Sequence, residues 1–257
     1  MKKLLVLSAI LFLTQLVFGQ KEMTFEIDGA KRRAVVYEGA GKTKKSPLLF
    51  VFHGHGGDAR VAQRRLDFHD AWKEAVVVYM EGIPGVVGIT DADGSKNGWQ
   101  KNPGELGDRD LKFFDEVLKS LEKDYKIDDK RIYAVGHSNG GRFVNVLWAA
   151  RGAEFAAFCA VAGPGGLMIK DAPPRSIWLS MGENDRLVPF ENQKRSAEFV
   201  QKLLRIDPKD GKTDGDITTY KGVGGTELVV EIRQAGHEFP QDSIPKMVEF
   251  FKRNTKN

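Results

Sequence analysis

The sequence has very little cysteine, no strong charge imbalance and one long apolar run. Cys159 is the single cysteine among 257 residues, which excludes an intramolecular disulfide and a thiolate metal cluster. It lies in the apolar stretch 155–161, where a small buried side chain is the expected role. The 39 basic and 35 acidic residues give a net charge of +4, and removing Lys2 and Lys3 leaves +2. Because the two signs are interspersed, the composition disfavours a nucleic-acid-binding protein.

The long apolar run lies at the N-terminus and has the features of a secretory leader. Two lysines precede the apolar stretch 4–18, and the small residue Gly19 follows it. The stretch is short for a transmembrane helix, although an uncleaved anchor remains an alternative. We therefore expect residues 1–19 to be a signal peptide. The mature chain would be secreted, to the periplasm or the extracellular space, without stable membrane association.

Residues 20–257 are expected to form one domain, because no repeat, low-complexity linker or appended binding module interrupts them. A hairpin turn at Asp28-Gly29 opens the pattern, and apolar runs then alternate with amphipathic helical segments. The expected strands are 24–28, 31–38, 48–52, 76–80, 131–135, 155–161, 176–181, 217–220 and 228–233, and the expected helices are 60–74, 108–125, 141–150, 191–204 and 243–253. This order predicts an α/β fold, with helices on both faces of a mostly parallel sheet and no separate cap domain.

A serine motif lies between one predicted strand and the next helix. Residues 136–140 read Gly-His-Ser-Asn-Gly, after the strand 131–135 and before the helix 141–150. A sharp strand-to-helix turn exposes its central serine, and flanking glycines keep side chains clear of the turn. The motif therefore predicts Ser138 as a nucleophile, with a tight structural turn as the alternative.

A serine nucleophile needs a base and a carboxylate that orients the base. When the order along the chain is serine, acid, histidine, His237 is the one histidine available after Ser138. The acid is either Glu183 or Asp185, which both follow the strand 176–181. Asp185 is favoured because it precedes a turn into a helix, although capping that helix would also explain it.

The segment 53–57, His-Gly-His-Gly-Gly, follows another strand end. Alternating His53 and His55 could ligate a metal, but no further cluster of candidate ligands lies near them in the sequence. The glycines favour an oxyanion loop, in which backbone N–H groups approach a substrate carbonyl. One donor would be the amide of Asn139, and the other that of His55 or Gly56. We therefore expect neither a metal nor a cofactor.

These residues together resemble the secreted esterases related to polyhydroxybutyrate depolymerases and feruloyl esterases, from about Ser46 to the C-terminus. The motifs that carry the resemblance are 53–57, Gly98-Trp99, 107–110, 136–141, 185–189 and Gly236-His237. The resemblance implies an α/β-hydrolase fold, triad roles for Ser138, Asp185 and His237, and a structural role for Asp110. The family often carries a cysteine beside the oxyanion glycines, where this chain has His55.

The resemblance implies a serine esterase acting on feruloyl or acetyl esters of plant polysaccharides, with polyhydroxyalkanoate depolymerisation as the alternative. A peptidase and a non-catalytic binding protein on the same fold are the other classes to consider. Trp99, in the long Gly-rich loop 81–106, could stack on a sugar or an aromatic acyl group, or could anchor the loop. The expected partner is a polymer-linked ester, and the sequence does not address oligomeric state.

Overall fold

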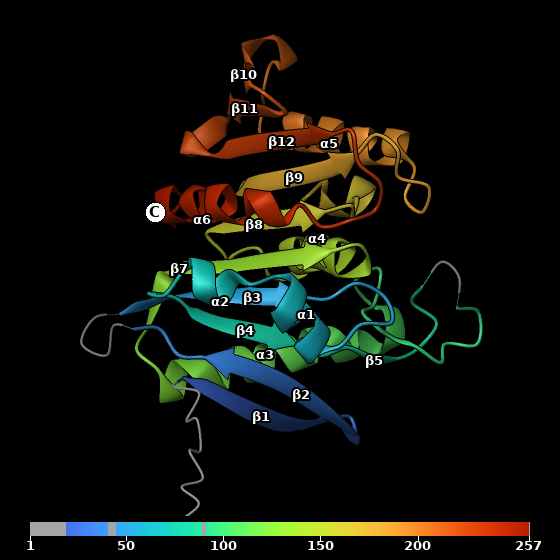
Figure 1. The fold of residues 1–257 in the computed structure, drawn as a ribbon, viewed down its shortest axis with the longest axis vertical. Coiled ribbons are helices and arrows are strands. Elements are labelled where there is room, and N and C mark those ends of the chain that lie inside the picture. Colours follow the sequence, from blue (N-terminus) through green and yellow to red (C-terminus); the bar gives the residue numbers. More distant parts are fainter. Residues whose placement is uncertain (1–18, 41–44, 89–90, 257) are drawn as a thin grey trace, which may run out of the picture.

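The computed structural model describes residues 19–40, 45–88 and 91–256, so the expected signal peptide lies outside it except for Gly19. The described strands form a ten-stranded sheet in the order β1-β2-β4-β3-β7-β8-β9-β12-β11-β10 (Figure 1). Their bounds are β1 (Gln20–Ile27), β2 (Ala30–Tyr37), β3 (Ser46–Phe52), β4 (Val76–Met80), β7 (Ile127–His137), β8 (Ala157–Val161), β9 (Ser176–Gly182), β10 (Lys212–Asp214), β11 (Ile217–Lys221) and β12 (Glu227–Arg233).

The central strands from β4 to β12 in this order are parallel, and the strands at both ends of the sheet are antiparallel. Parallel pairing joins the carboxyl ends of the central strands at one edge, where ligands bind in open α/β sheets. The predicted mostly parallel α/β sheet is confirmed.

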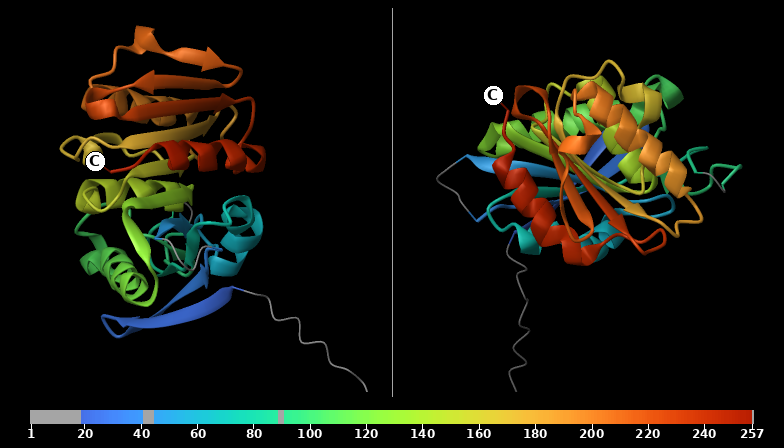
Figure 2. Two further views of the ribbon diagram at one scale, coloured as in Figure 1. Left: turned by 90° about the vertical axis from the view of Figure 1, so that its left-hand side faces the viewer. Right: turned by 90° about the horizontal axis from the view of Figure 1, so that it is seen from above.

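Helices cover both faces of the sheet (Figure 2). One face packs against α3 (Arg109–Asp124), α4 (Asn139–Arg151) and α5 (Phe190–Leu203), and the other against α1 (Ala59–Arg65), α2 (Phe68–Ala71) and α6 (Ile244–Arg253). Strand β3 is apolar over residues 48–52 because its alternating side chains enter both layers: Phe50 joins the first core and Val51 the second. Among the described residues, no helix combines the length and apolar character needed to cross a bilayer.

The single helix expected over 60–74 is wrong, because the chain forms two short helices there. The Asp58 side chain accepts a hydrogen bond from the Val61 amide and begins α1, which ends after Arg65. Leu66 and Phe68 are both buried. An uninterrupted helix turns 100° per residue and would place these two side chains on nearly opposite sides. The break lets both enter the core.

The predicted loop after β4 contains a small ladder of its own, in which β5 (Ile83–Pro84) pairs with β6 (Asn97–Gly98). The loop is tied to the core by Asp110, whose carboxylate bonds the Arg32 guanidinium at 2.7 Å and the Gln100 amide at 2.7 Å. Both side chains of the ion pair are fully buried. Removing one partner of such a pair typically costs about 3–5 kcal/mol, which agrees with the structural role implied for Asp110.

Candidate active site

Ser138 lies on a strained turn between β7 and α4, with φ 56° and ψ −120°. Its amide donates to the Val161 carbonyl at 2.8 Å, which fixes the turn against the end of β8. A Cβ on Gly136 would lie 2.3 Å from the Gly140 carbonyl oxygen, and one on Gly140 would lie 2.4 Å from that of Phe52. These approaches are possible only for glycine, so the two motif glycines permit the strained serine conformation.

The structure brings Ser138, His237 and Asp185 into one hydrogen-bonded chain. The Ser138 Oγ lies 2.7 Å from His237 Nε2, and His237 Nδ1 lies 2.8 Å from Asp185 Oδ2. An ionised carboxylate only accepts hydrogen bonds, so Nδ1 carries the imidazole proton and Nε2 is free to accept the serine proton. This is the arrangement that a nucleophile, a general base and an orienting acid require.

The loops that carry the acid and the base are fastened to each other. The Glu183 amide donates at 2.9 Å to the carbonyl of Arg233, the last residue of β12, and the Asn184 amide donates at 3.0 Å to that of Ala235. Residues 234–242, which follow β12 and carry His237, are called the histidine-bearing segment below. A Cβ on Gly182 would lie 2.1 Å from the Gly236 carbonyl oxygen, so a glycine is needed for this approach. Glu183 is exposed, and its carboxylate makes no hydrogen bond within the described part of the chain. The structure therefore places Asp185, and not Glu183, against the imidazole.

Asp185 is held in its ionised form. Burial alone would raise the pKa of its carboxyl group, but hydrogen bonds from the Val188 amide, His237 and the Leu187 amide lower that pKa below its ordinary value. Its Oδ1 accepts from the Leu187 and Val188 amides at 2.8 and 2.9 Å, and Gln193 donates to Oδ2. Asp185 therefore shapes its own turn and orients His237, but it does not cap α5, which follows Pro189 without a side-chain cap.

The predicted oxyanion loop passes directly over the serine, since a Cβ on Gly54 would lie 3.3 Å from the Ser138 Cβ. Asn139 is the first residue of α4, and its amide has no acceptor within the helix. Across the described chain, the amides of His55 and Asn139 donate to no protein acceptor, whereas that of Gly56 donates to the Asn97 carbonyl at 2.7 Å. Of the two alternatives, His55 is therefore the available donor opposite Asn139.

The side chains of both histidines in the oxyanion loop contact other protein groups. His53 Nδ1 donates to the Gly54 carbonyl at 2.7 Å, and its Nε2 accepts from the Gly82 amide at 2.9 Å. Burial lowers the pKa of His53, which keeps the ring neutral. His55 Nε2 lies 3.1 Å from the Asp91 carboxylate. The absence of a metal remains a prediction that chelation can test.

One group among the described residues has metal-ligand spacing, and it lies outside the catalytic cleft. Asp67, His69 and Asp70 bring one ligand atom each within 4.8 Å of one another. Asp70 already pairs with Lys73, and His69 Nδ1 lies 2.8 Å from the Tyr79 hydroxyl. These contacts give the group a structural explanation.

Trp99 anchors the loop, and the interpretation that it stacks on substrate is wrong. Its side chain is fully buried, packs on Phe143 and donates from Nε1 to the His53 carbonyl at 2.9 Å. The Asn139 side chain binds the Trp99 backbone on both sides, accepting from its amide at 2.7 Å and donating to its carbonyl at 3.0 Å. Sequence reasoning assigned Asn139 only a backbone role and missed this side-chain contact.

His137, which precedes the nucleophile in the motif 136–140, also contacts the catalytic histidine. Its Nε2 donates to the backbone carbonyl of His237 at 2.8 Å, and the two rings lie 5.1 Å apart. Burial, followed by the charge of His237, lowers the pKa of His137 to about 4. A neutral ring therefore fixes the backbone of the catalytic histidine without placing a second charge beside it. No local sequence pattern indicates this contact, because it joins residues 100 positions apart.

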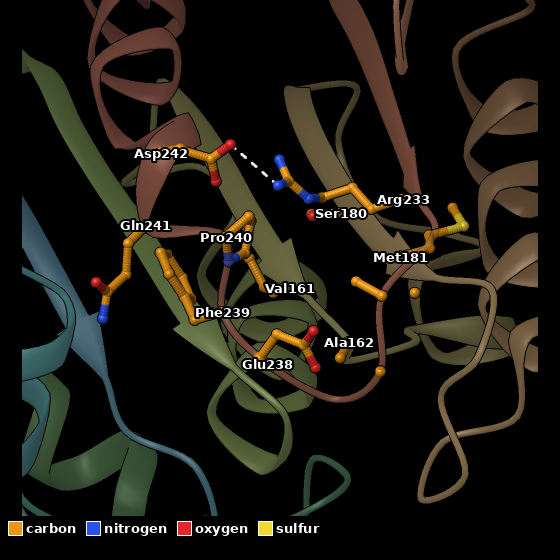
Figure 3. A pocket seen from close by; sticks show the side chains of 13 residues that line it. Val161, Ala162, Ser180, Met181, Arg233, Glu238, Phe239, Pro240, Gln241 and Asp242 are labelled. Carbon is orange, nitrogen blue, oxygen red and sulfur yellow. Dashed lines mark hydrogen bonds and ion pairs between the residues drawn. The ribbon is translucent and has the colours of Figure 1, made fainter.

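The triad opens into a cleft of about 830 Å³. Its walls come from the oxyanion loop, α1, the acid loop and the histidine-bearing segment. The residues that line it are His53, Gly54, His55, Gly56, Gly57, Val61, Ala62, Arg65, Leu66, Lys96, His137, Ser138, Leu187, His237, Glu238, Phe239 and Gln241. A second cavity of about 360 Å³ lies among the ends of β8 and β9 and the segment 235–242 (Figure 3). Arg233 and Asp242, paired at 3.0 Å, belong to its lining. No histidine lines it, so the serine chemistry belongs to the larger cleft.

Comparison with known proteins agrees with this architecture. The model of the prolyl oligopeptidase family matches residues 79–197, which include Ser138 and Asp185 but not His237. A solved ferulic acid esterase superposes with a TM-score of 0.64 at 17% identity, covering 91% of this chain and 97% of that protein. The chain has the α/β-hydrolase fold. The fold predicted from the sequence is confirmed.

Two curated proteins similar to this chain are esterases by name. The bifunctional acetylxylan esterase/xylanase XynS20E of Neocallimastix patriciarum is 29% identical over 166 residues. The putative esterase NocK of Nocardia uniformis subsp. tsuyamanensis is 28% identical over 173 residues. Each match covers 63% of this chain, and the chain spans 23% and 47% of the two relatives' lengths. The expected likeness to esterases of the α/β-hydrolase type is confirmed.

Proposed function

We propose that this α/β-hydrolase is a serine carboxylic-ester hydrolase that removes acetyl or feruloyl groups from plant polysaccharides. The hydrogen-bonded chain from Ser138 through His237 to Asp185 is the observation that carries the proposal. Ser138 attacks the ester carbonyl while His237 Nε2 takes its proton, and the imidazolium then protonates the leaving alcohol. Water, activated by the same ring, releases the acyl group from Ser138. The amides of His55 and Asn139 stabilise the oxyanion of both tetrahedral intermediates.

Substrate class is supported by the relatives' names and by the shape of the site. The names of the relatives point to acetylxylan and ferulic acid esters. The cleft is bordered by loops and by α1, and no inserted domain covers it within the described ranges. A cleft of this kind leaves room for an ester attached to a polymer, whose remote groups can contact the rim and orient the reacting carbonyl.

Turnover of a matched substrate panel tests the proposal. Purified protein is assayed with acetylated xylo-oligosaccharide, a feruloylated arabino-oligosaccharide, the methyl esters of both acids, a hydroxybutyrate oligomer and a prolyl peptide amide. The oligosaccharide esters are expected to give the highest kcat/KM, with activity that survives prolonged chelation. Preference for the hydroxybutyrate oligomer would reassign the enzyme as a polyhydroxyalkanoate depolymerase. Preference for the peptide, suggested by the family match, would make it a peptidase.

The leader supports a further proposal, that the enzyme is exported after cleavage near Gly19. A polymeric substrate outside the cell would require this location. Expression in a bacterial host with N-terminal sequencing of the protein recovered outside the cytoplasm checks it. An intact Met1 on a cytoplasmic product would contradict it.

A further inference from the structure

The charged side chains that line the catalytic cleft are few and unbalanced in sign. They are Arg65, Lys96 and Glu238, so the cleft carries two cations and one carboxylate besides its histidines. All three are exposed, and none forms an ion pair or side-chain hydrogen bond with another described residue. Their charges therefore remain available to a ligand.

Lys96 is held close to the oxyanion end of the cleft. Its backbone amide donates to the Asp91 carboxylate at 3.0 Å, and the neighbouring Asn97 carbonyl accepts from the Gly56 amide. A Cβ on Gly56 would lie 3.7 Å from the Lys96 Cδ, so the aliphatic part of the lysine lies over the oxyanion loop. The Lys96 ammonium forms no ion pair with the Asp91 carboxylate, whose oxygens contact the Ser95 and Lys96 amides and the His55 ring.

Arg65 approaches the same cleft from α1. It is the last residue of that helix and lines the cleft together with Val61 and Leu66. Its charge is among the causes that lower the pKa of His137, after burial and the charge of His237, which places the guanidinium within electrostatic reach of the His137 ring. Two cations thus reach the cleft from two separate segments, the loop before Trp99 and α1.

We infer that the cleft selects esters that carry a carboxylate close to the scissile bond, and that Arg65 and Lys96 recognise this carboxylate. The inference rests on the proposed ester hydrolase function and narrows its substrate class. Leu187, which is 56% exposed, and Phe239 supply apolar contact in the same cleft. The Glu238 carboxylate would repel the substrate carboxylate, which limits the preference for anionic esters. The carboxylate belongs either to the acyl group, as in a dicarboxylic hemiester, or to the alcohol, as in an acetylated uronic acid.

Two pairs of probes separate these sources. Nitrophenyl acetate and nitrophenyl hemisuccinate differ by a carboxylate in the acyl group, and acetylated methyl glucoside and methyl glucuronoside differ by one in the alcohol. We expect the anionic member of one pair to have the higher kcat/KM, and the pair that shows it identifies the source. The preference should disappear between about 10 mM and about 1 M salt, where the Debye length falls from about 30 Å to about 3 Å.

Variants assign the preference to the two cations. Arg65→Gln and Lys96→Gln should each lower the anionic-to-neutral ratio of kcat/KM by about two- to fivefold, the range expected of exposed ion pairs. Glu238→Gln should raise the ratio. Lys31→Gln, which makes the same charge change at an exposed position of β2 away from the cleft, is the matched control and should leave the ratio unchanged. Equal kcat/KM within both pairs, or a ratio unchanged in both cation variants, would overturn the inference.

A binding measurement keeps this inference separate from the proposed chemistry. If folded protein cleaves none of the four probes and no ester of the substrate panel above, the ester hydrolase function is wrong. Thermal stabilisation by succinate and glucuronate, compared with methyl glucoside, then still decides the anion site. We expect stabilisation by one of the anions that is lost in the Arg65→Gln/Lys96→Gln double variant. Equal melting temperatures with and without the anions would contradict the site.

Discussion

The two sides of the catalytic cleft obtain their geometry from different sources. On the strand-end side, Ser138, Asp185 and His237 each follow a parallel strand of the same sheet, and backbone pairing brings those strand ends together. On the loop side, the Trp99 indole joins its loop to the oxyanion segment 53–57 through the His53 carbonyl, and the Asn139 side chain joins the Trp99 backbone to α4.

The difference shows which parts of the site are determined by the fold and which by single contacts. A strand end is fixed by many backbone hydrogen bonds, so one substitution there changes chemistry more than position. The loop side depends on a few buried polar contacts, each worth about 1 kcal/mol or more when its loss leaves a buried group unpaired. Substitutions on the loop side should therefore change stability and the alignment of the oxyanion donors together.

The largest effect is expected at the nucleophile. Ser138→Ala should lower kcat by about 10⁶, because the acyl-enzyme can no longer form, while the fold is retained. Hydrolysis of a nitrophenyl ester measures the loss, with circular dichroism as the control for folding. A serine-directed phosphonate should add mass at Ser138 alone. Undiminished turnover in the folded variant would contradict the nucleophile assignment.

The next effect tests which acid belongs to the strand-end side. Asp185→Asn should lower kcat by about 10⁴, since an amide at this position favours the wrong imidazole tautomer and cannot stabilise the imidazolium. Glu183→Gln is the matched control and should change kcat little, because its carboxylate does not contact His237. The reverse order of losses would transfer the orienting role to Glu183.

On the loop side, Trp99→Phe removes the indole hydrogen bond to the His53 carbonyl and keeps most of the ring. Leaving that buried carbonyl unpaired should lower the free energy of unfolding by about 1–3 kcal/mol. Urea denaturation measures this change. Because Trp99 is buried, kcat/KM should fall by the same factor for oligosaccharide and methyl esters. A selective loss for the oligosaccharide would restore a substrate contact.

The smallest effect concerns His137, which links the turn between β7 and α4 to the histidine-bearing segment. Its pKa is lowered from 6.5 to about 4, so the unfolded chain binds more protons than the folded chain between these values. The free energy of unfolding should therefore decrease as pH falls through this window, by up to about 1.4 kcal/mol per pH unit from this residue. His137→Gln, which keeps a donor, should flatten this slope when chemical denaturation is repeated across the window.

His137→Phe is the matched variant, because it removes the donor and keeps an aromatic ring. It should lose more kcat than His137→Gln at pH 7. Equal kcat in the two variants would show that the hydrogen bond to the His237 carbonyl does not position the base.

Most of the sheet could be predicted from the sequence, because the patterns that specify its strands and its hairpin turn lie within a few neighbouring residues. Continuous apolar runs such as 48–52 and 76–80 specify strands buried on both faces, and the Asp28-Gly29 turn specifies the hairpin. The prediction of one helix over 60–74 was wrong, because the helical spacing of apolar residues continues through Leu66. Burial of both Leu66 and Phe68 breaks the helix, and burial depends on the neighbouring strands.

For the site, the sequence by itself determined the candidates for nucleophile, acid and base. The serine motif, the order of serine, acid and histidine, and the ends of the predicted strands can all be identified from the sequence. Tertiary structure decided between Asp185 and Glu183, between the His55 and Gly56 amides, and between a substrate contact and an anchor for Trp99. Each of these choices depends on a contact between segments distant in sequence, such as the Gly56 amide with the Asn97 carbonyl. Side-chain direction and burial are set only when those segments pack, so no local pattern records them.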